Sequence, residues 1–268
     1  FYNERVEASR NFANKVWNAS RFIMMNMDEN IIDEPSHDLF TLADRWILSA
    51  ANTLAKDVTD NMDKFELGIA VQKVYDFIWD EFCDWYVEMA KFRIYHKEEA
   101  PEAANCALWV LKTVLAQGLK LLHPFMPFIT EEIWQHLPHE GESIMISEWP
   151  EYDEKLIDKE LENDMEEVLD IVVLGRACRN TANIKNRQPI GMMYVKAPEA
   201  LSDFYIDIIE DELNVKKVEF TDDVAAFTAY SFKPQLKTLG RRFGKNINAV
   251  REILANIDGS KAMAELKE

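Results

Sequence analysis

One continuous stretch of apolar and aromatic residues, residues 67–95, constrains the fold more than any other part of this sequence. It runs LGIAVQKVYDFIWDEFCDWYVEMAKFRIY and contains no proline. On a helical wheel its apolar side chains cover a wide arc, wider than a helix with a single buried face needs. We therefore expect one long central helix that packs on several sides within a helical bundle.

Other stretches with helical periodicity lie on both sides of this segment. They predict helices over 2–27, 39–60 and 102–122, a short helix that ends near 137, and a long helix from about 154 that stops before Pro189. Ser36 or Asp38 is the expected N-cap of the second of these helices. Pro127 suits a first helical turn, where its missing N–H costs nothing.

After Pro189 the pattern changes to short β-type runs, which are expected over 192–197, 215–220 and 226–233. Helical segments are expected between the first two runs, over 200–212, and after the third, over 245–256. The predicted fold class is therefore mostly α, with an antiparallel helical bundle followed by a small α+β domain. The predicted domains are 1–187 for the bundle and 188–268 for the α+β part.

Composition narrows the class of protein. The three cysteines, Cys83, Cys106 and Cys178, form no CxxC pair, which argues against a cysteine zinc site and favours a reduced, cytoplasmic compartment. No apolar run is long enough to span a membrane. His136 and His139 lack a third ligand, so no metal site is expected. Because the chain starts at Phe1 within a helical pattern, we expect it to be part of a longer polypeptide.

The charge of the chain is strongly acidic overall but unevenly distributed. The formal net charge is −18, yet residues 1–27 carry +2, residues 171–198 carry +5 and residues 224–251 carry +6, and the last two segments contain no acid. These segments together hold +13, which leaves −31 on the rest of the chain. One basic run is usually a solvated face, but three of them favour an anionic partner, because local potential decides what binds where.

The segment RNFANKVWNASRF, residues 10–22, gives the first helix two different faces. One face is apolar and suits a core; it holds Phe12, Val16, Ala19 and Ile23. The other face combines guanidinium groups, amides and an indole within an arc of about 100°; it holds Arg10, Asn14, Trp17, Asn18 and Arg21.

Two interpretations of the second face remain open from spacing alone. Arginines, amides and aromatic rings are the groups that bind phosphates, base edges and base faces of unpaired nucleotides. Alternatively, Trp17 is a core residue, and Asn14 and Asn18 bond to neighbouring backbone. The segment 175–189 repeats the mixture, with Arg176, Arg179 and Asn183 expected on one helical face. The segment 237–246 is expected to be a glycine-bracketed basic loop that meets backbone phosphates.

Several long motifs resemble one known family. RNFANKVWNASRF, ADRWILS, YDFIWDEFCDWYVEMAK and LKLLHPFMPFITEEIWQHLP closely resemble the anticodon-binding helical bundle of class Ia aminoacyl-tRNA synthetases. Over residues 1–150 the resemblance is closest to the valyl enzymes. From about residue 155, GRACRNTANIKNRQPIG, DELNVKKVEF and FKPQLKTLGRRFGK look like the C-terminal region of the isoleucyl enzymes.

This resemblance implies a function for the chain and for its parent. The parent would be a ligase that uses ATP and Mg²⁺ to attach valine, or isoleucine, to tRNA in the cytoplasm. The HIGH and KMSKS signatures that carry that chemistry are absent here, so this part should bind tRNA without charging it, with no catalytic residue and no cofactor of its own. Its expected partners are tRNA and the rest of the synthetase chain, and not DNA or a membrane.

The tRNA-binding residues carried over from the resemblance and from the basic segments form one set. They are Arg10, Asn14, Trp17, Asn18, Arg21, Phe22, Arg176, Arg179, Lys185, Arg187, Arg241, Arg242 and Lys245. The alternative function is a non-catalytic helical interaction module whose basic patches bind an acidic protein partner. That module would bind its partner without regard to RNA.

Overall fold

The structure is a computed structural model, and it describes residues 2–27, 34–197, 201–222 and 232–267. The chain divides into two compact units, Phe1–Glu167 and Val168–Glu268. The division falls inside one helix, earlier in the sequence than the expected boundary after residue 187. Residues 168–187 contain side chains, such as Val172 and Arg179, that are buried within the second unit.

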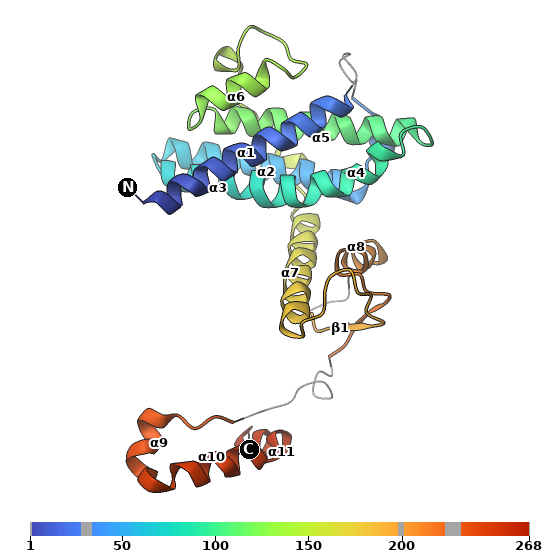
Figure 1. The fold of residues 1–268 in the computed structure, drawn as a ribbon. Coiled ribbons are helices and arrows are strands. Elements are labelled where there is room, and N and C mark those ends of the chain that lie inside the picture. The colour runs from blue at the N-terminus through green and yellow to red at the C-terminus, as the bar shows by residue number, and fades with distance from the viewer. Residues whose placement is uncertain (1, 28–33, 198–200, 223–231, 268) are drawn as a thin grey trace. The chain divides into compact units, whose positions relative to one another are not determined.

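The first unit is an antiparallel helical bundle, as expected (Figure 1). Successive long helices run in alternating directions, with α2 packed against α3 and α5, and α5 packed against α4. The elements of this unit are α1 (Asn3–Asn26), η1 (His37–Leu39), α2 (Leu42–Asp63), α3 (Leu67–Asp76), η2 (Phe77–Tyr86), α4 (Val87–Tyr95), α5 (Pro101–Leu122), α6 (Pro127–Trp134), η3 (Ile144–Ile146) and η4 (Glu154–Leu156).

The predicted central helix over 67–95 is confirmed, with one irregularity. It is built from α3, η2 and α4 in direct succession, and η2 has π-helical hydrogen bonding. The π segment is rich in large side chains that are buried on several sides, among them Phe77, Ile78, Phe82, Trp85 and Tyr86. A π segment widens the helix locally and re-aims the residues that follow it.

The N-cap of α2 differs from the prediction. Ser36 precedes only the single turn η1, and α2 begins at Leu42 with Thr41 as its cap. The Thr41 hydroxyl accepts from the Asp44 N–H at 3.2 Å, and the Asp44 carboxylate accepts from the Thr41 N–H at 2.8 Å. This reciprocal capping box satisfies two backbone donors at once, which a cap at Ser36 or Asp38 would leave unpaired.

Asp44 also lies at the centre of a buried polar network. Its carboxylate accepts hydrogen bonds from the Arg93 guanidinium, at 2.8 Å from Nη1, and from the Tyr86 hydroxyl. Burial alone raises the pKa of Asp44, but the hydrogen bond and charge of Arg93, with the bond from Tyr86, outweigh it and lower the pKa. The carboxylate therefore stays charged and joins α2, η2 and α4.

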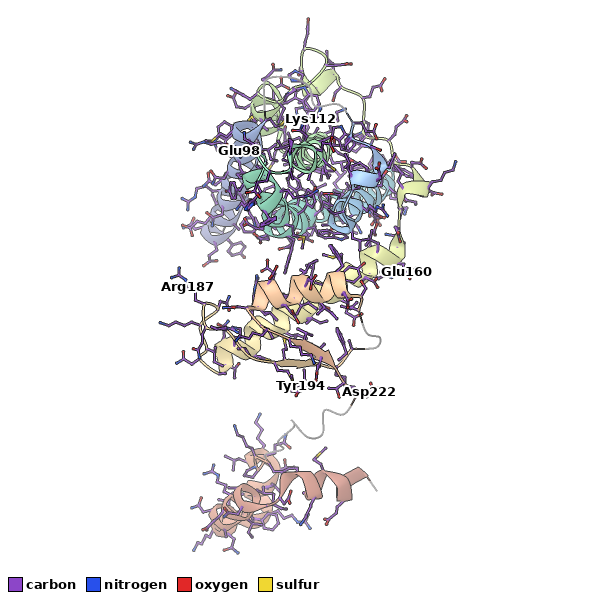
Figure 2. All side chains as sticks on the ribbon, turned by 90° about the vertical axis from the view of Figure 1, so that its right-hand side faces the viewer. Glu98, Lys112, Glu160, Arg187, Tyr194 and Asp222 are labelled. Atoms are coloured by element: carbon purple, nitrogen blue, oxygen red, sulfur yellow. The ribbon has the colours of Figure 1, made fainter. Side chains whose placement is uncertain are left out.

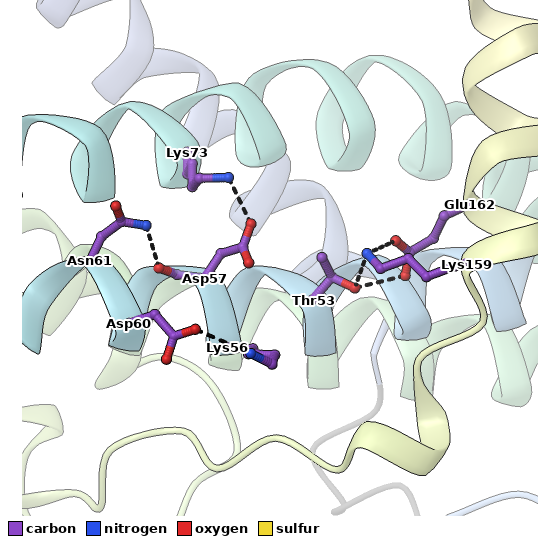
Figure 3. A network of polar contacts seen from close by, with 8 residues as sticks. All are labelled: Thr53, Lys56, Asp57, Asp60, Asn61, Lys73, Lys159 and Glu162. Atoms are coloured by element: carbon purple, nitrogen blue, oxygen red, sulfur yellow. Dashed lines mark hydrogen bonds and ion pairs between the residues drawn. The ribbon is translucent and has the colours of Figure 1, made fainter.

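The long helix α7 (Lys159–Thr181) starts and ends inside its predicted range of about 154 to 188. At its start, Asp158 accepts from the Leu161 N–H at 3.1 Å. The Glu162 carboxylate then accepts from Thr53 on α2 at 2.8 Å and from Lys159 at 2.7 Å (Figure 3). The bond from Thr53 attaches the first turn of α7 to α2 within the first unit.

The second unit contains a small βαβ arrangement. Strands β1 (Met193–Val195) and β2 (Val218–Phe220) pair in parallel, with Tyr194 opposite Glu219, and α8 (Asp203–Leu213) lies between them in sequence. Gly175 lets α7 approach the end of α8, because a Cβ there would lie 2.3 Å from a methyl of Leu213. Both strands and α8 confirm the small α+β part that the sequence predicts.

The C-terminal part of the second unit is more helical than expected. The elements are α9 (Leu236–Phe243), η6 (Gly244–Asn246), α10 (Ile247–Asn256) and α11 (Gly259–Lys267). The prediction of a basic loop over 237–246 is therefore wrong, because these residues belong to α9 and η6. Gly240 lies within α9, and only Gly244 adopts a positive φ in this segment. Most of the third predicted strand, 226–233, lies outside the described residues.

A half-buried carboxyl in the bundle gives a pH prediction. Burial, followed by the charge of Glu162, raises the pKa of Glu81 from 4.5 to about 7, and Asp80, Glu166 and Asp76 add to the effect. A group whose pKa is raised by folding stabilises the protein below its unfolded pKa and loses that contribution as pH rises through the folded pKa. Wild-type stability should therefore fall between about pH 4.5 and 7 by up to about 3 kcal/mol from this group.

We expect Glu81→Gln, which keeps the shape of the protonated side chain, to be more stable than wild type at pH 8 and equal to it near pH 4. Urea unfolding followed by tryptophan fluorescence measures this, because all seven tryptophans lie before residue 150 and report on the first unit. The exposed Glu88→Gln is the matched control. A difference between Glu81→Gln and wild type that does not change with pH would contradict the prediction.

Candidate nucleic-acid interface

Helix α1 separates a core side from a solvent side, as its sequence predicts. Phe12, Val16 and Ile23 are buried. The ring of Phe12 stacks on Tyr75 with centroids 4.5 Å apart, and it also lies against Trp79. These contacts fix the rotation of α1 on the central helix, and they thereby determine which residues of α1 face outward.

The outward face of α1 carries the predicted nucleotide-binding residues. Arg10, Asn14, Asn18 and Arg21 are exposed, and no hydrogen bond or ion pair joins them to other described residues. Trp17 lies among them and is 38% exposed. The interpretation of Trp17 as a core residue, with the asparagines capping nearby backbone, is therefore wrong.

Lys15 differs from the two arginines of the same segment. Its Nζ lies 2.7 Å from Asp84 and 3.8 Å from the centre of the Trp79 ring. The ammonium is thus engaged by the central helix through an ion pair and a cation–π contact. Of the three cations in residues 10–22, Arg10 and Arg21 are the two that face solvent without an acidic partner.

An aromatic group on α4 extends this face, and the sequence patterns did not reveal it. The ring of Phe22, which is half-buried, meets Tyr95 edge to face at 6.3 Å, and Lys91 lies 5.5 Å from the same ring. Tyr95 is 67% exposed and Phe92 is 70% exposed. The only feature of the sequence that indicates their exposure is their position in the last turns of the central helix. We call this group, together with the outward face of α1, the α1–α4 surface.

The basic residues at the end of α7 do not share one face. Arg176 is exposed and pairs with Glu212 at 2.6 Å. Arg179 is 3% exposed and donates to the backbone carbonyls of Lys185, Gln188 and Leu213. The helix ends at Thr181, so Asn183 lies beyond it with a φ of 55°. The expected common face of Arg176, Arg179 and Asn183 is therefore wrong.

Arg179 has a structural role that its chemistry explains. A guanidinium has five donors, and three carbonyl acceptors hold it where no acid lies nearby in the sequence. These bonds fold the segment after α7 back onto the helix and leave Lys185 and Arg187 exposed on it. Figure 2 shows Arg187 at the edge of the second unit. Arg179 is accordingly not a surface contact for a nucleic acid.

The remaining predicted contacts lie near the C-terminus. Arg242 and Lys245 are exposed, and the Arg242 guanidinium lies 5.9 Å from the ring of Phe243. The side chain of Arg241 lies outside the described residues. These cations are placed on α9 and η6 rather than on a loop.

The described residues contain no cluster of three or more His, Cys, Asp or Glu side chains that could hold a metal ion. His136 and His139 each place Nδ1 near a backbone carbonyl instead. Within the same described ranges, no helix is both long and apolar enough to cross a membrane.

A comparison with protein families identifies the fold of residues 44–197. These residues, more than half of the chain, match the family described as the anticodon-binding domain of tRNA ligase. The chain belongs to this family. The match covers most of the bundle, α7 and β1, and it confirms the resemblance given by the sequence motifs.

Similar proteins agree with this assignment. Valine–tRNA ligase of Clostridium acetobutylicum is 52% identical over 185 residues, which are 69% of this chain and 21% of the relative. Valine–tRNA ligase of Clostridium perfringens is 47% identical over 224 residues, which are 82% of this chain and 25% of the relative. The chain thus spans about a fifth to a quarter of the length of these curated relatives.

Among solved structures, the ternary complex of Agrobacterium radiobacter K84 agnB2 LeuRS with tRNA and LeuAMS is similar at 15% sequence identity. It matches 87% of this chain and 24% of that chain, with a TM-score of 0.42.

The burial of Arg179 leads to a stability prediction. Arg179→Ala should destabilise the second unit by about 2–4 kcal/mol, because three hydrogen bonds to a charged group are lost and the carbonyl of the buried Leu213 is left unpaired. Arg176→Ala, which removes an exposed ion pair from the same helix, should cost at most about 1 kcal/mol. Amide hydrogen exchange over residues 168–222 measures both, and equal effects of the two variants would refute the assigned role.

Proposed function

We propose that this chain binds tRNA and reads its anticodon through the α1–α4 surface. One observation carries the proposal. Trp17 is exposed between two arginines without acidic partners and two amides without partners, on the side of α1 opposite the buried Phe12, Val16 and Ile23. An indole provides a stacking platform for an unpaired base, arginines bind phosphate or stack, and amides bond to base edges.

The aromatic group on α4 supports the proposal independently of α1. Tyr95 offers an exposed ring beside Phe22, and Phe92 offers another on the same helix, beside His96. Stacking on rings of this kind is worth about 1–3 kcal/mol per base. Several rings on adjacent helices suit a loop of splayed nucleotides better than a duplex, whose bases are already stacked. An anticodon loop is a substrate of that kind.

The family and the clostridial relatives support a tRNA ligase as the longer polypeptide. We propose valine as its amino acid, with isoleucine as the alternative, because the relatives are valine–tRNA ligases and the tail resembles the isoleucyl enzymes. ATP and Mg²⁺ would act in a catalytic part outside this chain, in the cytoplasm. No residue of this chain is assigned to them, and the chain alone is proposed to bind tRNA without charging it.

The basic residues of the second unit fit a supporting role. Lys185, Arg187, Arg242 and Lys245 are exposed cations, and cations of this kind contribute salt-dependent affinity for backbone phosphates without base specificity. They are proposed as phosphate contacts. Arg176 joins them only if its ion pair with Glu212 opens.

Anticodon reading is tested with substituted tRNAs. The chain should bind valine tRNA about 10-fold or more tightly than the same tRNA with its central anticodon base replaced, because stacking and base-edge bonds depend on that base. Fluorescence titration at fixed salt measures both affinities. A substitution in the acceptor stem is the control and should have no effect. Equal affinity for every anticodon variant would exclude anticodon reading.

The part played by α1 is tested with a double variant. Arg10→Ala with Arg21→Ala should weaken tRNA binding and leave thermal stability unchanged. The slope of log affinity against log salt concentration should become shallower by about one to two, because fewer counterions are released on binding. The matched control, Arg45→Ala with Lys64→Ala, removes the same charge from exposed positions of α2 and the following turn. Unchanged tRNA affinity in the first variant, with altered stability, would favour the protein-interaction module instead.

A further inference from the structure

The second unit contains a cavity that the proposed anticodon surface does not use. Its volume is about 420 Å³, which is within the range of about 300–1,000 Å³ for ligand pockets. It lies between α7 and β1, and the segments that precede β1 and follow α8 also line it. The apolar part of its wall includes Ile171, Ile184, Ile190, Met193 and Val215.

The cavity has one buried charge in its wall. Arg179 lines it and is held by three backbone carbonyls, and no carboxylate pairs with it among the described residues. Its Nε is buried and has no hydrogen-bond partner there. A buried guanidinium that only carbonyl dipoles compensate gives the cavity a positive potential. An apolar cavity with this potential favours a flat aromatic ligand with electronegative edges or an attached anion.

Part of the lining of the cavity is exposed, and it includes one exposed cation, Lys196. Leu174 is 65% exposed, and Cys178 is the exposed one of the three cysteines. Lys196 lines the cavity and is exposed without a described partner, and Lys185 and Arg187 lie on the segment that Arg179 holds. Residues 171–198 contain no acid. Tyr194 of β1 also lines the cavity and is 44% exposed (Figure 2).

We propose that this cavity binds one unpaired nucleobase of the bound tRNA, with the flanking phosphates held by Lys196, Lys185 and Arg187. The inference rests on the proposed function and adds a second nucleotide site to it. A purely apolar occupant, such as a peptide side chain, would account for the aliphatic wall but not for a buried guanidinium without a carboxylate partner or for the exposed Lys196 in the lining. A base attached to phosphates accounts for all three.

The test fills the cavity and leaves the rest of the unit intact. Cys178 and Ala177 are adjacent and exposed on α7, but only Cys178 lines the cavity. Cys178→Trp in the full chain should weaken binding of valine tRNA at least about fivefold, because the base loses its site. Ala177→Trp, the matched control, should bind as wild type does.

A second measurement avoids any effect on folding. Iodoacetamide should modify Cys178 in the folded protein and leave the other two cysteines intact, because both are buried and burial raises the pKa of Cys106 to about 11. Bound tRNA should slow this modification, and the modified protein should bind tRNA more weakly. Inorganic phosphate, at a concentration equal to that of the phosphate groups of the tRNA, should not protect the Cys178 thiol, because the inferred site requires a base.

The outcomes separate this inference from the proposed function. If both Trp variants bind tRNA as wild type does and anticodon discrimination persists, the cavity is not a nucleotide site and the proposed function stands. A change in oligomeric state on filling the cavity, without a change in tRNA affinity, also overturns the inference in favour of a second copy as occupant. If wild type does not bind tRNA at all, both proposals fail.

Discussion

The buried carboxylate of Asp44 is the interaction on which the geometry of the bundle depends. It completes the capping box with Thr41 and accepts from Tyr86 and Arg93, so one group joins the start of α2 to both η2 and α4. Removing one partner of such a buried pair costs far more than an exposed ion pair is worth, because a charge is left without compensation. The central helix fixed in this way is the surface on which Phe12 of α1 packs. The direction in which Trp17 faces follows from that chain of contacts.

Arginine serves three different purposes in this protein, and the partners distinguish them. Arg93 is held inside the bundle by a carboxylate, and Arg179 is held inside the second unit by carbonyls. Arg10 and Arg21 have no described partner and face solvent. A guanidinium with satisfied donors organises the protein, whereas one with free donors is available to a ligand. The proposed interface therefore uses the arginines that the fold leaves unpaired.

Local patterns in the sequence predicted the bundle helices and the outward face of α1, because periodicity and the wheel positions of Arg10 and Arg21 are local properties. The true cap was also visible, as Thr41 followed three residues later by Asp44, but Ser36 offered an equally good cap by residue type. The burial of Arg179 could not be predicted, because its acceptors include Leu213, thirty-four residues further on. Exposure of Phe92 and Tyr95 likewise depends on where the neighbouring helices end, and aromatic composition alone is more typical of a core.

Because the chain as a whole is acidic, the local arrangement of charge decides where an RNA can bind. A chain of net charge −18 repels a polyanion at long range, and at physiological salt that repulsion is screened beyond about 8 Å. Only cations within contact distance and without acidic partners then attract the phosphates. A surface built in this way gives little non-specific affinity, because most of the protein is unfavourable to RNA, and it leaves discrimination to stacked bases and base-edge bonds. Such a balance suits the proposed function, in which the chain retains one tRNA and rejects most others.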